Sequence, residues 1–150
     1  MKKEDKRNGE YFITKEGKEI YKIISPRVKL RDILQIIVGA TILAVPVGFT
    51  EETWNLGGML PLTNILIIMG VSILFAGSFI YHHYKHKVHG HFLDFAKRVL
   101  ATYIFSFLVV ALMLTLIQRA PWQTDILLAF KRTVIVSLPA SMSAAVADTI

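Results

Sequence analysis

Residues 62–81 read LTNILIIMGVSILFAGSFIY, a run of 20 residues without a charged side chain. An α-helix needs about 20 apolar residues to cross the roughly 30 Å hydrocarbon core of a bilayer, so this run predicts a transmembrane helix. Three further uncharged apolar runs occupy residues 33–49, 99–117 and 133–147. With their flanking residues, they predict helices at about 33–52, 97–117 and 133–150.

The composition of the 150-residue chain also indicates a membrane protein. Hydrophobic residues make up 53% and charged residues only 19%, and the mean hydropathy is +0.50. This excludes a disordered chain, which needs low hydrophobicity. The chain has no cysteine, which excludes disulfides and thiolate metal sites. We predict an all-α fold, a four-helix transmembrane bundle in residues 32–150 that sits in a lipid bilayer.

The polar N-terminal segment, residues 1–31, carries ten Lys and Arg against five Asp and Glu. Two β-prone runs at residues 11–14 and 19–23 flank a turn that contains Gly17, which predicts a short β-hairpin. Basic residues are also concentrated between the second and third spans, within residues 85–98. Because Lys and Arg accumulate in cytoplasmic loops, we predict a multi-pass protein of the cell membrane with both termini in the cytoplasm.

The most distinctive stretch follows the first span. Residues 46–57 read PVGFTEETWNLG, and the span opens with RDILQIIVGA from residue 31. The Thr-Glu-Glu-x-Trp-x-Leu-Gly motif in this context resembles a family of small prokaryotic, largely archaeal, integral membrane proteins whose common label is a domain of unknown function. The resemblance runs from Asp32 to the C-terminus. It implies a fold and a location and brings no activity or cofactor.

Glu51 and Glu52, at the predicted outer end of the first span, are the first candidate site. Acidic residues at membrane depth are costly and often mark ion paths, so these carboxylates and Asp148 are candidates for a cation path. In the structural alternative, Lys131 or Arg132, predicted at the same face and depth, forms ion pairs with the glutamates. Plain solvation of both carboxylates is the third interpretation.

Pro46 and Pro139 lie inside the first and last predicted helices. Each is expected to bend its helix, because proline lacks an N–H and its ring crowds the preceding turn. Residues 31–46 also resemble residues 124–139 at a constant offset. A true repeat would relate two oppositely directed helices, as in the inverted repeats of transporters.

Two further groups of residues stand out. His82 and His86 are four residues apart, which suits a transition metal on one helical face. The positive charge of the neighbouring lysines opposes a bound cation, so a pH-dependent positive charge on the histidines is the favoured alternative. Small residues recur at helical spacing in the last span, which favours a close helix–helix contact over a pore lining; they are Ser137, Ser141, Ala144 and Ala145.

Two functions are compatible with these patterns. The first is a small cation transporter or channel-like protein that uses Glu51 and Glu52 and is a homo-oligomer, because a four-helix protomer has little interior. The second is a non-transporting membrane scaffold or accessory subunit. The chain contains no nucleophile elbow, phosphate loop or zinc-protease motif, so we expect no enzyme and no cofactor. Its basic segment is mixed with acids, so we expect no nucleic-acid binding.

Overall fold

The structure, a computed structural model, describes residues 30–84 and 92–149. These residues form five α-helices: α1 (Leu30–Gly48), α2 (Glu51–Met59), α3 (Leu62–Tyr84), α4 (Phe92–Leu116) and α5 (Ile126–Thr149). The four long helices are each apolar and long enough to cross a membrane, whereas α2 has nine residues. The predicted all-α bundle with four spans is therefore confirmed. The predicted β-hairpin lies outside the described residues.

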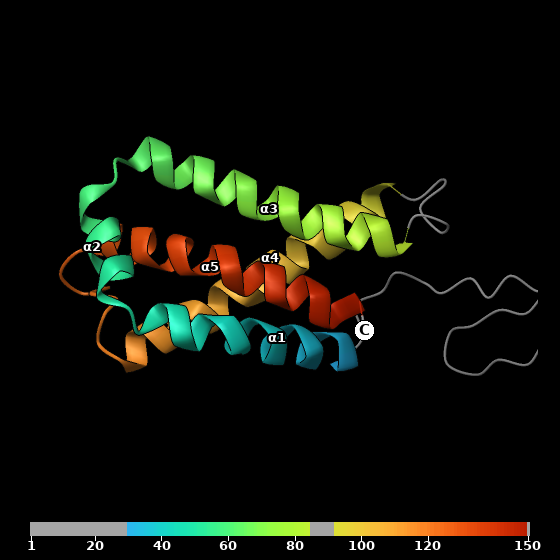
Figure 1. Cartoon of the computed structure of the whole chain (residues 1–150), viewed down its shortest axis with the longest axis horizontal. Coiled ribbons are helices and arrows are strands. Elements are labelled where there is room, and N and C mark those ends of the chain that lie inside the picture. The colour runs from blue at the N-terminus through green and yellow to red at the C-terminus, as the bar shows by residue number, and fades with distance from the viewer. Residues whose placement is uncertain (1–29, 85–91, 150) are drawn as a thin grey trace, which may run out of the picture.

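α5 is the central helix of the bundle. It lies between α1 and α3 in Figure 1, and it contacts all four other helices. Small side chains let membrane helices approach each other closely, so a helix rich in them can pack against several neighbours. The four small residues singled out in the last span are all buried, which confirms that this face makes helix–helix contacts; they are Ser137, Ser141, Ala144 and Ala145.

α1 and α5 approach each other closely at Gly39. A Cβ atom built on Gly39 would lie 2.6 Å from the Ala147 Cβ and 2.9 Å from the Ala144 Cα. A Cβ on Gly48 would lie 3.9 Å from the Val136 Cγ1. Later residues of α1 thus meet earlier residues of α5, so the two helices run antiparallel (Figure 1). An inverted repeat of residues 31–46 and 124–139 requires this direction, and the repeat itself stays a prediction.

Large apolar side chains lie exposed on the outside of the long helices. Lipid is as apolar as these side chains, so it solvates them, and the backbone hydrogen bonds of each span are closed within its own helix. The outward-facing residues include Val38 and Ile42 on α1, Leu74 on α3, and Leu112 on α4.

The first predicted helix, residues 33–52, is two helices in the structure. α1 ends at Gly48, and α2 begins at Glu51 after a short turn. In Figure 1, α2 lies across one end of the bundle, between the ends of α1 and α3. We call this the α2 end. The sequence did not reveal α2, because its nine residues are too few and too polar to form an apolar span.

The last helix begins at Ile126, seven residues before its predicted start at 133. The Asp125 carboxylate accepts a hydrogen bond from the Leu128 N–H at 2.9 Å and so caps the first turn. Lys131 and Arg132 therefore lie inside α5 rather than before it. α4 likewise begins at Phe92 rather than at 97.

Both prolines lie inside helices that continue past them, Pro46 in α1 and Pro139 in α5. Each removes one backbone hydrogen-bond donor from its helix. The bend expected at each position stays a prediction.

The C-terminal turn of α4 supports a stability prediction. Gln118 has a φ of 59°, in the left-handed region that favours glycine. The Gln118 N–H donates to the Thr115 carbonyl at 3.0 Å and the Arg119 N–H to the Leu114 carbonyl at 2.8 Å, the two bonds of a Schellman motif. We expect Gln118→Gly to raise the free energy of unfolding by about 1 kcal/mol, because it relieves the strain of a Cβ atom there. Thermal unfolding in detergent measures this change.

The matched control is Gln118→Ala, which keeps the Cβ atom and should bring no gain. A lower unfolding temperature for Gln118→Gly than for the unchanged chain would contradict the strain argument.

Candidate functional site

The Thr-Glu-Glu-x-Trp-x-Leu-Gly motif, residues 50–57, caps the C-terminal end of α1. The Val47 carbonyl accepts hydrogen bonds from the Thr50 N–H at 3.2 Å, the Thr50 hydroxyl at 2.8 Å and the Thr53 hydroxyl at 3.1 Å. The Gly48 carbonyl accepts one from the Trp54 indole N–H at 2.8 Å. The last carbonyls of a helix have no partners within it, so the motif supplies them at the point where the chain turns into α2.

Glu51 and Glu52 are the first two residues of α2, and both are exposed. The N-terminus of a helix carries a partial positive charge that favours acidic side chains in the first turn. Among residues 30–84 and 92–149, neither glutamate forms an ion pair within 4.0 Å. Their surroundings are therefore a helix N-terminus at the surface of the bundle.

Lys131 and Arg132 do tie α5 to the α2 end, but through backbone carbonyls. The Lys131 ammonium donates to the Leu60 carbonyl at 2.9 Å. The Arg132 guanidinium donates to the Trp54 carbonyl at 3.2 Å and to the Arg119 carbonyl at 2.7 Å. The expected ion pairs with the glutamates do not form within the described part of the chain. Two of these three acceptors, the carbonyls of Trp54 and Leu60, lie in α2 and directly after it. The sequence did not predict α2, so it could not predict these two contacts.

Gly57, the last residue of the motif, makes room for this contact. A Cβ atom built on it would lie 2.5 Å from the Arg132 Cγ. The Arg119 guanidinium lies 3.8 Å from the centre of the Trp54 ring and forms a cation–π contact with it. The motif thus joins α1, α2, α5 and the α4–α5 connection.

A cluster of three buried charges lies at the opposite end of the bundle. Arg98 of α4 donates two hydrogen bonds to the carboxylate of Asp148 of α5, from Nε at 2.9 Å and from Nη2 at 2.8 Å. The same Nη2 lies 3.6 Å from a carboxylate oxygen of Asp32, in the first turn of α1. The three residues are only 8% (Asp32), 7% (Arg98) and 6% (Asp148) exposed. We call this set the Asp–Arg–Asp cluster.

The cluster changes the interpretation of Asp148. The sequence made Asp148 a candidate for a cation path together with Glu51 and Glu52. In the structure Asp148 is buried, forms a bidentate pair with Arg98, and lies at the opposite end of the bundle from the glutamates. A charge-assisted bidentate pair is strong and directional, so it fixes the ends of α4 and α5 relative to each other.

Sequence reasoning did not identify Arg98 and Asp32 as site residues. In the sequence, Arg98 belongs to the basic residues between the second and third spans that predict orientation, and Asp32 belongs to the opening of the first span. One signal was present: each of the three charges flanks an apolar run at the same predicted face.

The polar side chains inside the bundle bond mainly within their own helices. Thr102 and Ser106 of α4 donate to the carbonyls four residues earlier, at 3.0 and 2.7 Å. Thr133 and Ser137 of α5 do the same at 2.8 and 2.7 Å. The Tyr103 hydroxyl differs, because it is buried with no hydrogen-bond partner among the described residues. The hydroxyl hydrogens of the four back-bonded residues are therefore used within their own helices.

The candidate metal ligands lie at the edge of the described part. His82 is exposed near the end of α3, and His86 lies outside the described residues. Within residues 30–84 and 92–149, no three His, Cys, Asp or Glu side chains gather into a metal site. Metal binding by the histidines therefore stays a prediction.

Comparison with known proteins agrees with the four membrane spans. The family model described as "Putative integral membrane protein (DUF2391)" matches residues 2–150. A search of curated proteins and a search of solved structures found no match to the chain. The match extends over nearly the whole sequence, including the four spans, the motif after α1 and the Asp–Arg–Asp cluster. The chain therefore belongs to the DUF2391 family of integral membrane proteins.

Proposed function

We propose that the protein is a non-transporting membrane scaffold or accessory subunit. The observation that carries this proposal is the use of its distinctive polar residues in contacts between helices. The motif at residues 50–57 caps α1 and contacts α5. The Asp–Arg–Asp cluster joins α1, α4 and α5. The proposal includes no catalytic role. In it, both termini lie in the cytoplasm, where the basic N-terminal segment binds partner proteins.

The core of the bundle also supports a scaffold. α5 occupies the centre, and Ser137, Ser141 and Ala144 on it are fully buried. A path through one protomer would have to separate α5 from its neighbours and break the Arg98–Asp148 pair. Such a rearrangement is costly, because an unpaired charge would be left in a buried site.

A cation path that uses Glu51 and Glu52 is the second candidate. Their exposure at the α2 end favours it, because Lys131 and Arg132 donate to carbonyls and leave both carboxylates open to solvent. Since the bundle centre is filled by α5, such a path would run between protomers.

Cation flux in proteoliposomes distinguishes the two functions. We expect K⁺ and H⁺ flux through vesicles that contain the purified protein to equal the flux through protein-free vesicles, because the protomer is closed. An added ionophore serves as the positive control in the same vesicles. Flux above the protein-free level would overturn the scaffold proposal. If Glu51→Gln combined with Glu52→Gln then removed that flux, the cation path would take its place.

A further inference from the structure

The α2 end lies at the boundary of the membrane-spanning helices. α1 and α4 end there, and α3 and α5 begin there (Figure 1). The two tryptophans of the chain, Trp54 and Trp122, belong to α2 and to the connection between α4 and α5. Tryptophan concentrates at the headgroup level of a bilayer. The polar side chains of this end are therefore at the level of the lipid phosphates.

Trp54 brings two guanidinium groups together at this end. The Arg119 guanidinium lies 3.8 Å from the centre of its ring, and Arg132 donates from Nε to its carbonyl at 3.2 Å. The Arg132 Nη1 also donates to the Arg119 carbonyl at 2.7 Å. The Trp54 ring is itself fixed, because its indole N–H donates to the Gly48 carbonyl at 2.8 Å. Two positive charges, which we call the arginine pair, are thus held around one residue.

Both guanidiniums keep hydrogen-bond donors that the described residues do not use. Arg119 is exposed and contacts the ring, and none of its side-chain N–H groups meets an acceptor within residues 30–84 and 92–149. Arg132 uses Nε and Nη1, and its Nη2 has no acceptor in the same part of the chain. Planar donor groups of this kind match the oxygen atoms of a phosphate.

Three carboxylates share the α2 end, but they do not neutralise the arginine pair by direct contact. Glu51 and Glu52 lie exposed in the first turn of α2. The Asp125 carboxylate accepts the hydrogen bond of the Leu128 N–H and caps α5. Among the described residues, no carboxylate oxygen lies within 4.0 Å of either guanidinium. The two like charges therefore repel each other, and an anion that contacts both would offset this repulsion.

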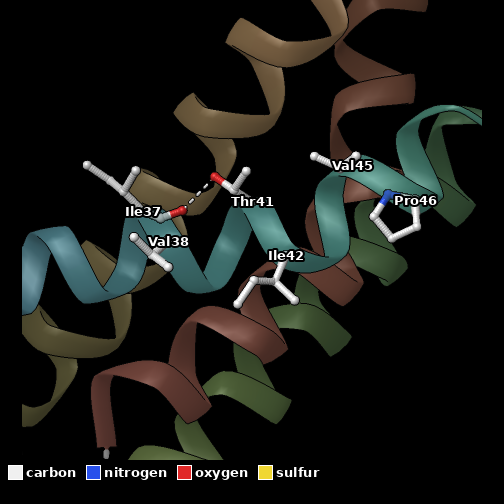
Figure 2. Close-up of a pocket in the computed structure, with 6 residues that line it drawn as sticks. All are labelled: Ile37, Val38, Thr41, Ile42, Val45 and Pro46. Carbon is white, nitrogen blue, oxygen red and sulfur yellow. Dashed lines mark hydrogen bonds between the residues drawn. The ribbon is translucent and has the colours of Figure 1, made fainter.

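The groove on the outward face of α1 does not offer such groups. Its volume is about 380 Å³, and Figure 2 shows that it runs along one helix. Its lining contains no charged side chain, and its one hydroxyl, on Thr41, donates to the Ile37 carbonyl at 2.7 Å. A phosphate placed there would lose its hydration without gaining a cation. The lining consists of Ile37, Val38, Thr41, Ile42, Val45 and Pro46.

We propose that the arginine pair, Arg119 and Arg132, binds the phosphate of an anionic phospholipid headgroup. The occupant follows from position and charge, because the bilayer supplies phosphates at this level and basic groups between membrane helices bind anionic headgroups. This inference goes beyond the proposed function, since either a scaffold or a cation path can bind a lipid. Free inorganic phosphate has the same chemistry, and the experiment separates the two sources.

Titration of phosphatidylglycerol into the purified chain in a neutral detergent tests the site. Native mass spectrometry measures the lipid bound and its dissociation constant. We expect Arg119→Gln to weaken binding about tenfold, because it removes charge-assisted hydrogen bonds to the phosphate. Arg119→Lys keeps the charge but not the planar donors, so its affinity should lie between the two. The Arg119 side chain contacts only the Trp54 ring among the described residues, so both variants should keep the circular dichroism of the unchanged chain.

Arg31→Gln is the matched control, because it removes an exposed arginine at the opposite end of the bundle. It should bind phosphatidylglycerol as tightly as the unchanged chain does. Full affinity in Arg119→Gln, or an equal loss in Arg31→Gln, would overturn the proposal. Phosphatidylcholine bound as tightly as phosphatidylglycerol would overturn the preference for an anionic lipid. Inorganic phosphate bound as tightly as phosphatidylglycerol would overturn the lipid as the source of the phosphate.

Discussion

Removing the Arg98 guanidinium is expected to cause a large loss of stability. Arg98→Met would leave the carboxylates of Asp148 and Asp32 in a site where both residues are less than a tenth exposed. Breaking a buried ion pair by removing one partner costs about 3–5 kcal/mol, because the remaining charge stays desolvated. Unfolding in detergent, followed by circular dichroism against temperature or denaturant, measures this loss.

A double-mutant cycle separates the pair from the rest of the site. Asp148→Asn should destabilise by a similar amount, and the double variant Arg98→Met with Asp148→Asn should lose less than the sum of the two single losses. Asp94→Asn is the matched control on the same helix, because the Lys97–Asp94 contact is exposed and 3.9 Å long. An exposed pair of this kind contributes at most about 1 kcal/mol. A loss for Arg98→Met no larger than for Asp94→Asn would contradict the structural role of the cluster.

The four spans could be predicted because the bilayer imposes a length and excludes charge. Residues 62–81 form an uncharged run that meets both requirements alone, and α3 covers it completely. The short α2 could not be predicted in this way. Its place depends on hydrogen bonds to the end of α1 and on the packing of Arg132 against Gly57, and neither contact leaves a periodic signal in the sequence.

Depth along the membrane predicted that Lys131 and Arg132 lie at the α2 end, but not which atoms they bond. Lys131 and Arg132 do lie near the end of the first span, as their depth indicates. Their acceptors are carbonyls of Leu60, Trp54 and Arg119, and every residue carries a carbonyl, so the residue types could not identify them. Glutamates were the obvious partners in the sequence, and α2 presents them on its exposed first turn instead.

The same depth argument, applied to the other end, would have brought the Asp–Arg–Asp cluster together. Asp32 precedes the first apolar run, Arg98 precedes the third, and Asp148 follows the fourth, so all three belong to one face. The sequence alone cannot choose Arg98 over the other basic residues between 85 and 98. That choice depends on which side of α4 faces α5, and small differences in helix packing decide it.

The packing of α1 on α5 predicts a second large effect, at Gly39. A methyl group there would lie 2.6 Å from the Ala147 Cβ, 2.9 Å from the Ala144 Cα and 2.9 Å from the Ser143 carbonyl oxygen. Two of these atoms are backbone, so no flexible side chain can move aside, and the helices must separate. We expect Gly39→Ala to lower the free energy of unfolding by about 3 kcal/mol, the upper part of the range for overpacked cores. Thermal unfolding in detergent measures the change.

Gly70→Ala is the matched control for this experiment, because it makes the same substitution inside another span. Apart from its chain neighbours and the backbone of its own helix, a Cβ atom on Gly70 would meet no atom of the described residues within 4 Å, so no packing contact opposes it. Alanine favours a helix over glycine by about 1 kcal/mol, so Gly70→Ala should leave stability unchanged or raise it. Gly39→Ala is therefore expected to lower stability and Gly70→Ala is not, although both gain the same helix propensity. If Gly39→Ala also raised stability, α1 and α5 could not approach each other as closely as the structure shows.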